Sequence, residues 1–114
     1  MDIKIIRQKI SKQELETLAK ETFVDMVKGV ADVKQGILAL GGELHADAEE
    51  VLLRSGSRQE DLWGFNIYIG KNTNDRIEYT SLINIRPRQN NFGREIKSST
   101  LREAVQKIIN ELIE

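Results

Sequence analysis

The side chains best suited to chemistry cluster around the only histidine of the chain. Residues 41–47 read GGELHAD, so that Glu43, His45 and Asp47 alternate. In an extended chain, alternating side chains point to the same side. Two carboxylates and an imidazole can bind a divalent metal, and together with Arg86 they are candidates for general acid–base catalysis. Because catalytic zinc sites usually contain more than one histidine, helix capping is the favoured interpretation and no cofactor is predicted.

A second set of candidates consists of amides and guanidinium groups. Asn66 and Asn84 lie within predicted strands, where asparagine is disfavoured. Arginine forks and amides suit a phosphate or a nucleic acid. The predicted ligand-binding residues are Asn66, Asn84, Arg86, Arg88 and Arg94. The alternatives are that the asparagines brace residues 43–61 by hydrogen bonds and that the arginines balance the acids of that segment.

The overall charge argues against a nucleic acid as the main partner. The chain carries 17 Lys and Arg against 18 Asp and Glu, a formal net charge of −1. Electrostatic attraction to a phosphate backbone needs an excess of positive charge. Contact with RNA would therefore depend on the loop from Arg86 to Arg94, in which Phe92 could stack on a base.

A predicted β-hairpin over residues 62–86 would position the asparagines and Arg86. Apolar residues alternate with polar or small ones over 62–70 and again over 77–86, a period of two that predicts strands with one apolar face. The residues between these strands are typical of a turn. Trp63 and Ile83 belong to the expected apolar face, and the amides belong to the other face.

Two amphipathic helices are predicted to cover the Trp63 face. Ser11 and Thr100 each precede a glutamate by three residues, which is the pattern of a capping box. The apolar stripe of the first helix continues to Val30, and the second helix runs from about Thr100 to the end. Shorter patterns predict strands at 3–7 and 36–40 and a short helix at 47–54.

These elements follow the order β-α-β-(short α)-β-β-α. The order predicts an α+β fold with an approximately four-stranded, mainly antiparallel sheet and both long helices on one face. A chain of 114 residues is expected to form one domain over residues 1–114.

Composition excludes several classes of protein. There is no cysteine, which excludes disulfides and thiolate metal sites. No apolar run approaches the roughly 18 residues needed to span a membrane. The first residues, MDIKII, do not form a signal peptide, because the apolar run is short and interrupted by Lys4. A cytoplasmic location with no membrane partner is therefore predicted.

Three motifs resemble those of an uncharacterised family of small prokaryotic proteins. They are GGELHAD at residues 41–47, DLWGFN at 61–66 and INIRP at 83–87. The resemblance spans nearly the whole chain and includes IIRQ at 5–8 and the capped first helix. The family is a domain of unknown function, so the resemblance implies a free-standing, single-domain prokaryotic protein and carries over no catalytic residue.

Two functions remain open from the sequence. The first is a binding or interaction module, which could form a homodimer. The second is a small metal- or phosphate-dependent hydrolase, ribonuclease-like in design. The residues of such a hydrolase would be Glu43, His45, Asp47, Asn66, Asn84 and Arg86. Convergence of these side chains in one cleft would favour the hydrolase, whereas dispersal would favour the binding module.

Overall fold

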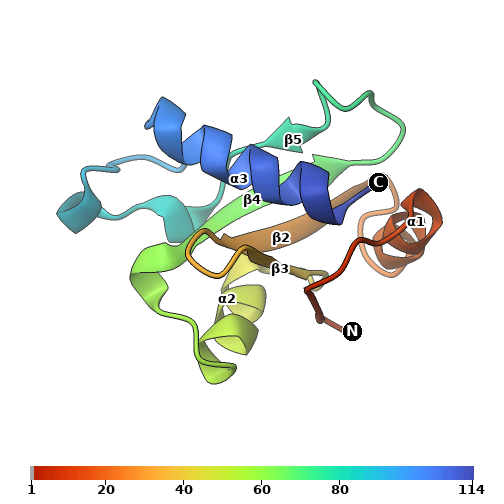
Figure 1. Cartoon of the computed structure of the whole chain (residues 1–114), viewed down its shortest axis with the longest axis horizontal. Coiled ribbons are helices and arrows are strands. Elements are labelled where there is room, and N and C mark those ends of the chain that lie inside the picture. The colour runs from red at the N-terminus through yellow and green to blue at the C-terminus, as the bar shows by residue number, and fades with distance from the viewer. Residues whose placement is uncertain (1) are drawn as a thin grey trace.

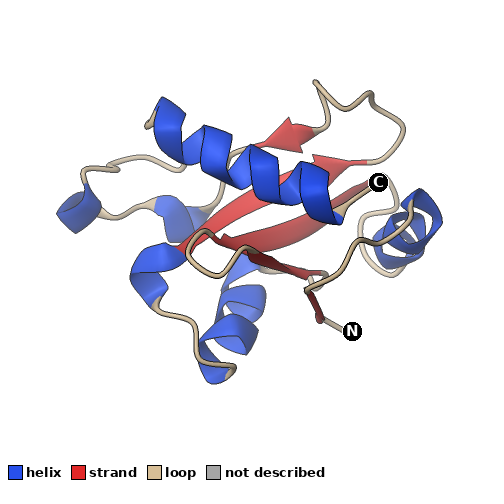
Figure 2. Ribbon diagram, viewed as in Figure 1, coloured by secondary structure: helices blue, strands red, loops and turns tan. Residues whose placement is uncertain are grey.

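The computed structural model describes residues 2–114 and contains a five-stranded antiparallel sheet with helices on both faces (Figure 1, Figure 2). In space the strands follow the order β1-β3-β2-β4-β5. Their bounds are Lys4–Ile6 (β1), Met26–Asp32 (β2), Ile37–Leu40 (β3), Leu62–Tyr68 (β4) and Ile77–Glu78 (β5). The predicted α+β class is confirmed, with five strands in place of about four.

Three α-helices and three short 3-10 helices complete the described chain. The α-helices are α1 (Lys12–Lys20), α2 (His45–Arg54) and α3 (Ser99–Leu112). The 3-10 helices are η1 (Gln59–Asp61), η2 (Leu82–Asn84) and η3 (Pro87–Gln89). The predicted capping box at Ser11 is present at the start of α1. None of the helices within residues 2–114 is long and apolar enough to cross a membrane.

The helices divide between the two faces of the sheet (Figure 1). Trp63 and Phe65 of β4 pack in one core with α1 and α3. Leu62 points to the opposite face, where it packs with Ala48 and Leu52 of α2. Successive residues of a strand face opposite sides, so β4 contributes to both cores. The predicted packing of two amphipathic helices against the Trp63 face is confirmed for α1 and α3.

The first helix is shorter than predicted. It ends at Lys20, and residues 26–32, which were expected to continue the helix to Val30, form the central strand β2. Val27 packs in the core under α1 and α3, whereas Val30 packs in the core under α2. A strand that is buried on both faces is apolar on both faces, and so short an apolar pattern also fits a helical stripe.

The second strand of the predicted hairpin is also shorter than expected. β5 pairs with β4 only at Asn66↔Glu78 and Ile67↔Ile77, and residues 82–84 form η2. The prediction of a strand through residue 86 was therefore wrong. Ile83, which was expected beside Trp63, packs instead with the α2 core on the opposite face.

A side-chain amide takes the place of the missing strand at Gly64. The Asn84 Oδ1 accepts a hydrogen bond from the Gly64 N–H at 2.8 Å, and its Nδ2 donates to the Gly64 carbonyl at 3.0 Å. A Cβ at position 64 would lie 2.5 Å from the Cβ of Ser81, so glycine is needed for this close approach. The chain from Ser81 to Asn84 therefore lies directly on β4 and forms one wall of the site described next.

Candidate functional site

A groove opens on the α2 face of the sheet, between the start of α2 and residues 80–83. Its volume is about 440 Å³, and its floor contains the side chains of His45 and Asn66. Lys28 and Arg94 line it as well, together with apolar side chains that include Leu44. We refer to this feature as the His45 groove.

His45 is the first residue of α2 and turns its ring toward β4. The side chain is 9% exposed, and Nε2 lies 2.8 Å from the main-chain oxygen of Phe65. A carbonyl oxygen can only accept, so Nε2 carries the proton and Nδ1 is an acceptor in the neutral ring. Burial lowers the pKa of His45 most strongly, and the charge of Lys28 lowers it further; the Phe65 carbonyl, the Asn66 side chain and the charge of Glu78 favour the protonated ring and oppose this shift without reversing it. The imidazole is therefore neutral at pH 7.

Asn66 holds a second acceptor on the floor of the groove. Its Nδ2 donates to Glu78 Oε1 at 2.8 Å and to the Thr80 carbonyl at 3.4 Å. Because both partners are acceptors, the orientation of the amide is defined. The Oδ1 atom is buried and has no hydrogen-bond partner among the described residues. A buried acceptor in this state costs about 1–3 kcal/mol.

The rim of the groove combines positive charge with exposed apolar surface. Neither Lys28 nor Arg94 forms an ion pair with an acid of the described chain, and no carboxylate from residues 2–114 lines the groove. Leu44 is 58% exposed and Leu82 is 65% exposed on opposite walls. The site therefore offers cations and apolar contacts at its mouth and acceptors at its floor.

Asn84 and Arg86, two of the predicted ligand-binding residues, lie outside the groove and bind the main chain. Asn84 is fully buried, and its amide is occupied by Gly64 and by the Arg94 carbonyl. The Arg86 guanidinium donates to the main-chain oxygens of Ile83, Gln59 and Leu62. Both side chains thus pair with main-chain groups along the edge of β4, and Arg86 also connects β4 to Gln59 in the preceding segment.

Arg86 also forms a partly buried ion pair. Its guanidinium lies 3.7 Å from Glu49 Oε2 and stacks 4.4 Å from the centre of the Trp63 ring. Burial raises the pKa of Glu49, and the charge of Arg86 opposes this rise. The role of Arg86 in this structure is to pack α2 against the end of β4.

Glu43 and Asp47 do not join His45. The expected alternation was wrong, because residues 45–54 are helical and not extended. Both acids are exposed and line an adjoining groove of about 610 Å³, which shares Lys28 and Leu44 with the His45 groove. Within residues 2–114, no group of three or more histidine, aspartate or glutamate side chains is arranged to hold a metal ion. The metal-binding arrangement considered from the sequence is therefore not assembled.

The remaining arginines of the predicted set also separate. Arg94 reaches the His45 groove, whereas Arg88 is an exposed residue of η3. Of the six side chains considered for a hydrolase, two lie in the His45 groove, two in the adjoining groove and two along the edge of β4.

Sequence reasoning missed Lys28, which it placed on the solvated face of a helix. In β2 the side chains of Lys28 and Val30 point to the same face, the one covered by α2. Applying a period of two to residues 26–32 would have placed Lys28 beside Asn66, with which it is paired in the register of β2 and β4.

A family model matches nearly the whole length of the chain. The family model described as "Protein of unknown function (DUF5674)" matches residues 4–112. The chain belongs to this family. The match includes all three motifs quoted from the sequence and confirms the resemblance to an uncharacterised family. No curated protein and no solved structure shows a significant match to the chain.

Proposed function

We propose that this member of the DUF5674 family is a binding module, and that its His45 groove binds a small carboxylate that also carries an N–H or O–H donor. The observation that carries the proposal is the buried Oδ1 of Asn66, which has no hydrogen-bond partner among the described residues. Folded proteins rarely retain such an atom without a reason, because the lost hydrogen bond opposes folding.

The floor of the groove determines which hydrogen-bonding group the ligand must carry. Oδ1 of Asn66 and Nδ1 of neutral His45 are both acceptors, and the two side chains are neighbours. A ligand donor that reaches Oδ1 of Asn66 supplies the hydrogen bond that the protein lacks while the ring of His45 is neutral. An amide, an ammonium or a hydroxyl group meets this requirement.

The rim sets the charge and the apolar part of the ligand. Lys28 and Arg94 attract an anion, since no acidic side chain of residues 2–114 lines the groove. Leu44 and Leu82 offer apolar surface of the size of a short aliphatic chain. The volume of about 440 Å³ lies within the range of small-molecule sites.

N-acetyl-leucine is a suitable probe because it has an amide N–H, a carboxylate and an aliphatic group. A ligand of about a dozen non-hydrogen atoms, at about 0.3 kcal/mol per atom, binds with a Kd in the low millimolar range. Titration followed by ¹H–¹⁵N NMR should shift the signals of His45 and Asn66. N-acetyl-leucinamide, which lacks the carboxylate, should bind more weakly.

Two arginine variants form a matched pair for this test. Arg94→Gln removes a charge from the rim and should weaken binding several-fold, whereas Arg88→Gln removes an exposed charge outside the groove and should leave binding unchanged. The proposal fails if N-acetyl-leucine leaves the groove signals unmoved at about 20 mM, well above the expected Kd. Equal weakening by both variants would also contradict it.

A further inference from the structure

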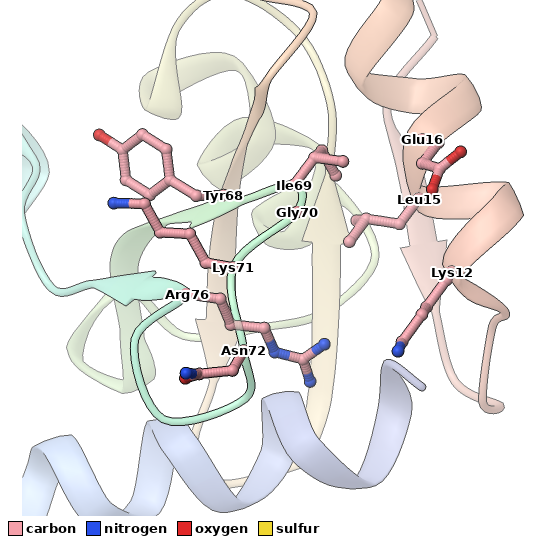
Figure 3. Close-up of a pocket in the computed structure, with 9 residues that line it drawn as sticks. All are labelled: Lys12, Leu15, Glu16, Tyr68, Ile69, Gly70, Lys71, Asn72 and Arg76. Carbon is pink, nitrogen blue, oxygen red and sulfur yellow. The ribbon is translucent and has the colours of Figure 1, made fainter.

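A second pocket lies on the other side of the sheet, between α1 and the loop from Ile69 to Arg76 (Figure 3). Its volume is about 350 Å³. The lining combines three cations, Lys12, Lys71 and Arg76, with the apolar side chains of Leu15 and Ile69. None of these residues lines the His45 groove, so the second pocket is independent of the function proposed above.

Arg76 is the buried centre of this pocket. It is 5% exposed, and its Nη1 and Nη2 donate to the main-chain oxygens of Glu114 and Ile113 and to Asn110 Oδ1. These bonds place a cation at the negative end of the α3 dipole, which stabilises that end of the helix. No side-chain carboxylate of residues 2–114 forms an ion pair with Arg76. Burial lowers its pKa, as expected for a cation that has lost water.

The capping of α3 does not explain the remaining donor of Arg76. Its Nε is buried and has no hydrogen-bond partner among the described residues. An arginine offers five N–H donors in a fixed plane, and burial of one without an acceptor is unfavourable. The guanidinium is therefore only partly satisfied by the protein.

Two lysines and one glutamate, Glu16, join Arg76 in the lining, so cations outnumber acids in this pocket. Figure 3 shows the ammonium group of Lys12 and the guanidinium of Arg76 directed toward one another, while the carboxylate of Glu16 is turned away from Arg76. Lys71 lies at the edge of the pocket, where its ammonium is turned toward the ring of Tyr68, with 4.7 Å between Nζ and the ring centre, and forms no ion pair with a described acid. Glu114 accepts a hydrogen bond from the main-chain N–H of Lys12 through Oε1 at 3.0 Å. The cations of Lys12 and Arg76, which face one another, favour an anion between them.

We propose that this pocket binds the phosphate group of a small organic phosphate monoester, with its organic part against Leu15 and Ile69. A phosphate monoester carries between one and two negative charges at pH 7 and has three acceptor oxygens. It can therefore meet several cationic donors at once, which a single carboxylate does less well. The apolar side of the pocket distinguishes an ester from inorganic phosphate, which has no group to place there.

Phenyl phosphate, inorganic phosphate and benzoate are the probes for the test. The readout is the ¹H–¹⁵N signal of the Arg76 Nε–H, together with the main-chain signals of residues 12–16 and 69–76. Phenyl phosphate should shift these signals at low millimolar concentration, and inorganic phosphate and benzoate should bind at least several-fold more weakly. The main-chain signals of residues 44–46, in the His45 groove, should not move, which separates this test from the previous one.

Lys12 and Lys71 are exposed, so their substitution should leave the fold intact, unlike substitution of the buried Arg76. Lys12→Gln combined with Lys71→Gln should weaken phenyl phosphate binding by about tenfold, whereas Lys107→Gln, an exposed change on α3, should leave it unaltered. An unmoved Arg76 Nε–H signal at about 20 mM phenyl phosphate would overturn the site. Equal affinity for inorganic phosphate and phenyl phosphate would overturn the assigned ligand class, and unchanged binding by the double variant would overturn the role of the lysines.

Discussion

Replacement of Asn84 by alanine tests whether a side-chain amide holds the edge of the sheet beside the His45 groove. Asn84 is fully buried, and its amide pairs with both the N–H and the carbonyl of Gly64. It also donates to the Arg94 carbonyl at 3.1 Å, which has a second donor in the Ser81 N–H. Alanine at position 84 thus leaves two main-chain groups of Gly64 without their partner on this edge.

The expected loss of stability follows from these two groups. Each buried main-chain group that loses its hydrogen bond costs about 1–3 kcal/mol, so Asn84→Ala should lower the free energy of unfolding by about 2–6 kcal/mol. A domain of this size has about 5–15 kcal/mol in total. A loss of about 3 kcal/mol moves the midpoint of urea unfolding by about 1–3 M.

Fluorescence of the single tryptophan provides the assay. Trp63 is buried, so its emission should shift to longer wavelength when the chain unfolds in urea. Asn74→Ala is the matched control, since Asn74 is exposed in the loop between β4 and β5. This variant should change the free energy of unfolding by no more than about 0.5 kcal/mol.

Asn84→Asp refines the same test. An aspartate can accept from the Gly64 N–H, but its second oxygen faces the carbonyls of Gly64 and Arg94. Burial and these oxygens raise the pKa of the new carboxyl in the folded state, so the destabilisation caused by its charge should be absent below about pH 4, the ordinary pKa of aspartate, and grow as the pH rises toward the raised pKa. Unfolding midpoints of Asn84→Ala and Asn74→Ala that agree with each other would refute the reasoning, because Gly64 would then not depend on Asn84.

Three further predictions concern single positions. Val24 is exposed and has a φ of +73°, in the left-handed region that favours glycine. Val24→Gly should therefore raise the free energy of unfolding by about 0.5–1 kcal/mol in the same urea assay. A loss of stability would show that contacts of the valine side chain outweigh the backbone strain. Burial alone would raise the pKa of Asp32, but hydrogen bonds from Ser57 and from the following turn lower it overall. The ionised carboxylate should therefore contribute its full stability above about pH 4, and this contribution should be lost as the pH falls. Ser57→Ala should make stability fall less on acidification, and an unchanged dependence of the free energy of unfolding on pH would contradict the role given to Ser57. The pKa of His45 should lie below the ordinary value of about 6.5, so the neutral ring contributes stability above that pH and this contribution is lost on acidification. The imidazole signals of this single histidine in NMR measure its pKa directly, and Lys28→Gln should raise that pKa. A pKa of His45 at or above the ordinary value in the unaltered protein would disprove the effect of burial.

Local patterns in the sequence determined most elements of the fold. The capping box at Ser11 marks the start of α1, and the alternation from Trp63 to Ile67 identifies β4 and its apolar face. These signals depend on residues close in the chain, so they need no knowledge of the tertiary structure. The same holds for the apolar stripe of α3.

The candidate site could be predicted only in part. His45 and Asn66 were singled out because a lone histidine and a mid-strand asparagine are unusual, and the structure brings both to one groove. The sequence could not distinguish Asn66, whose Oδ1 has no partner, from Asn84, whose amide is fully occupied by main chain. Both are asparagines near strands, and only the position of Gly64 relative to Asn84 separates them.

Sequence by itself determined that this chain forms a sheet with amphipathic helices and carries a few unusual polar side chains. Tertiary structure decided which of those side chains meet. It turned the segment around Val27 into a central strand, because that strand is buried on both faces and its pattern has no unique period. It also placed Lys28 beside Asn66 and buried Arg76 at the end of α3, since contacts between distant segments depend on packing and leave no local signal.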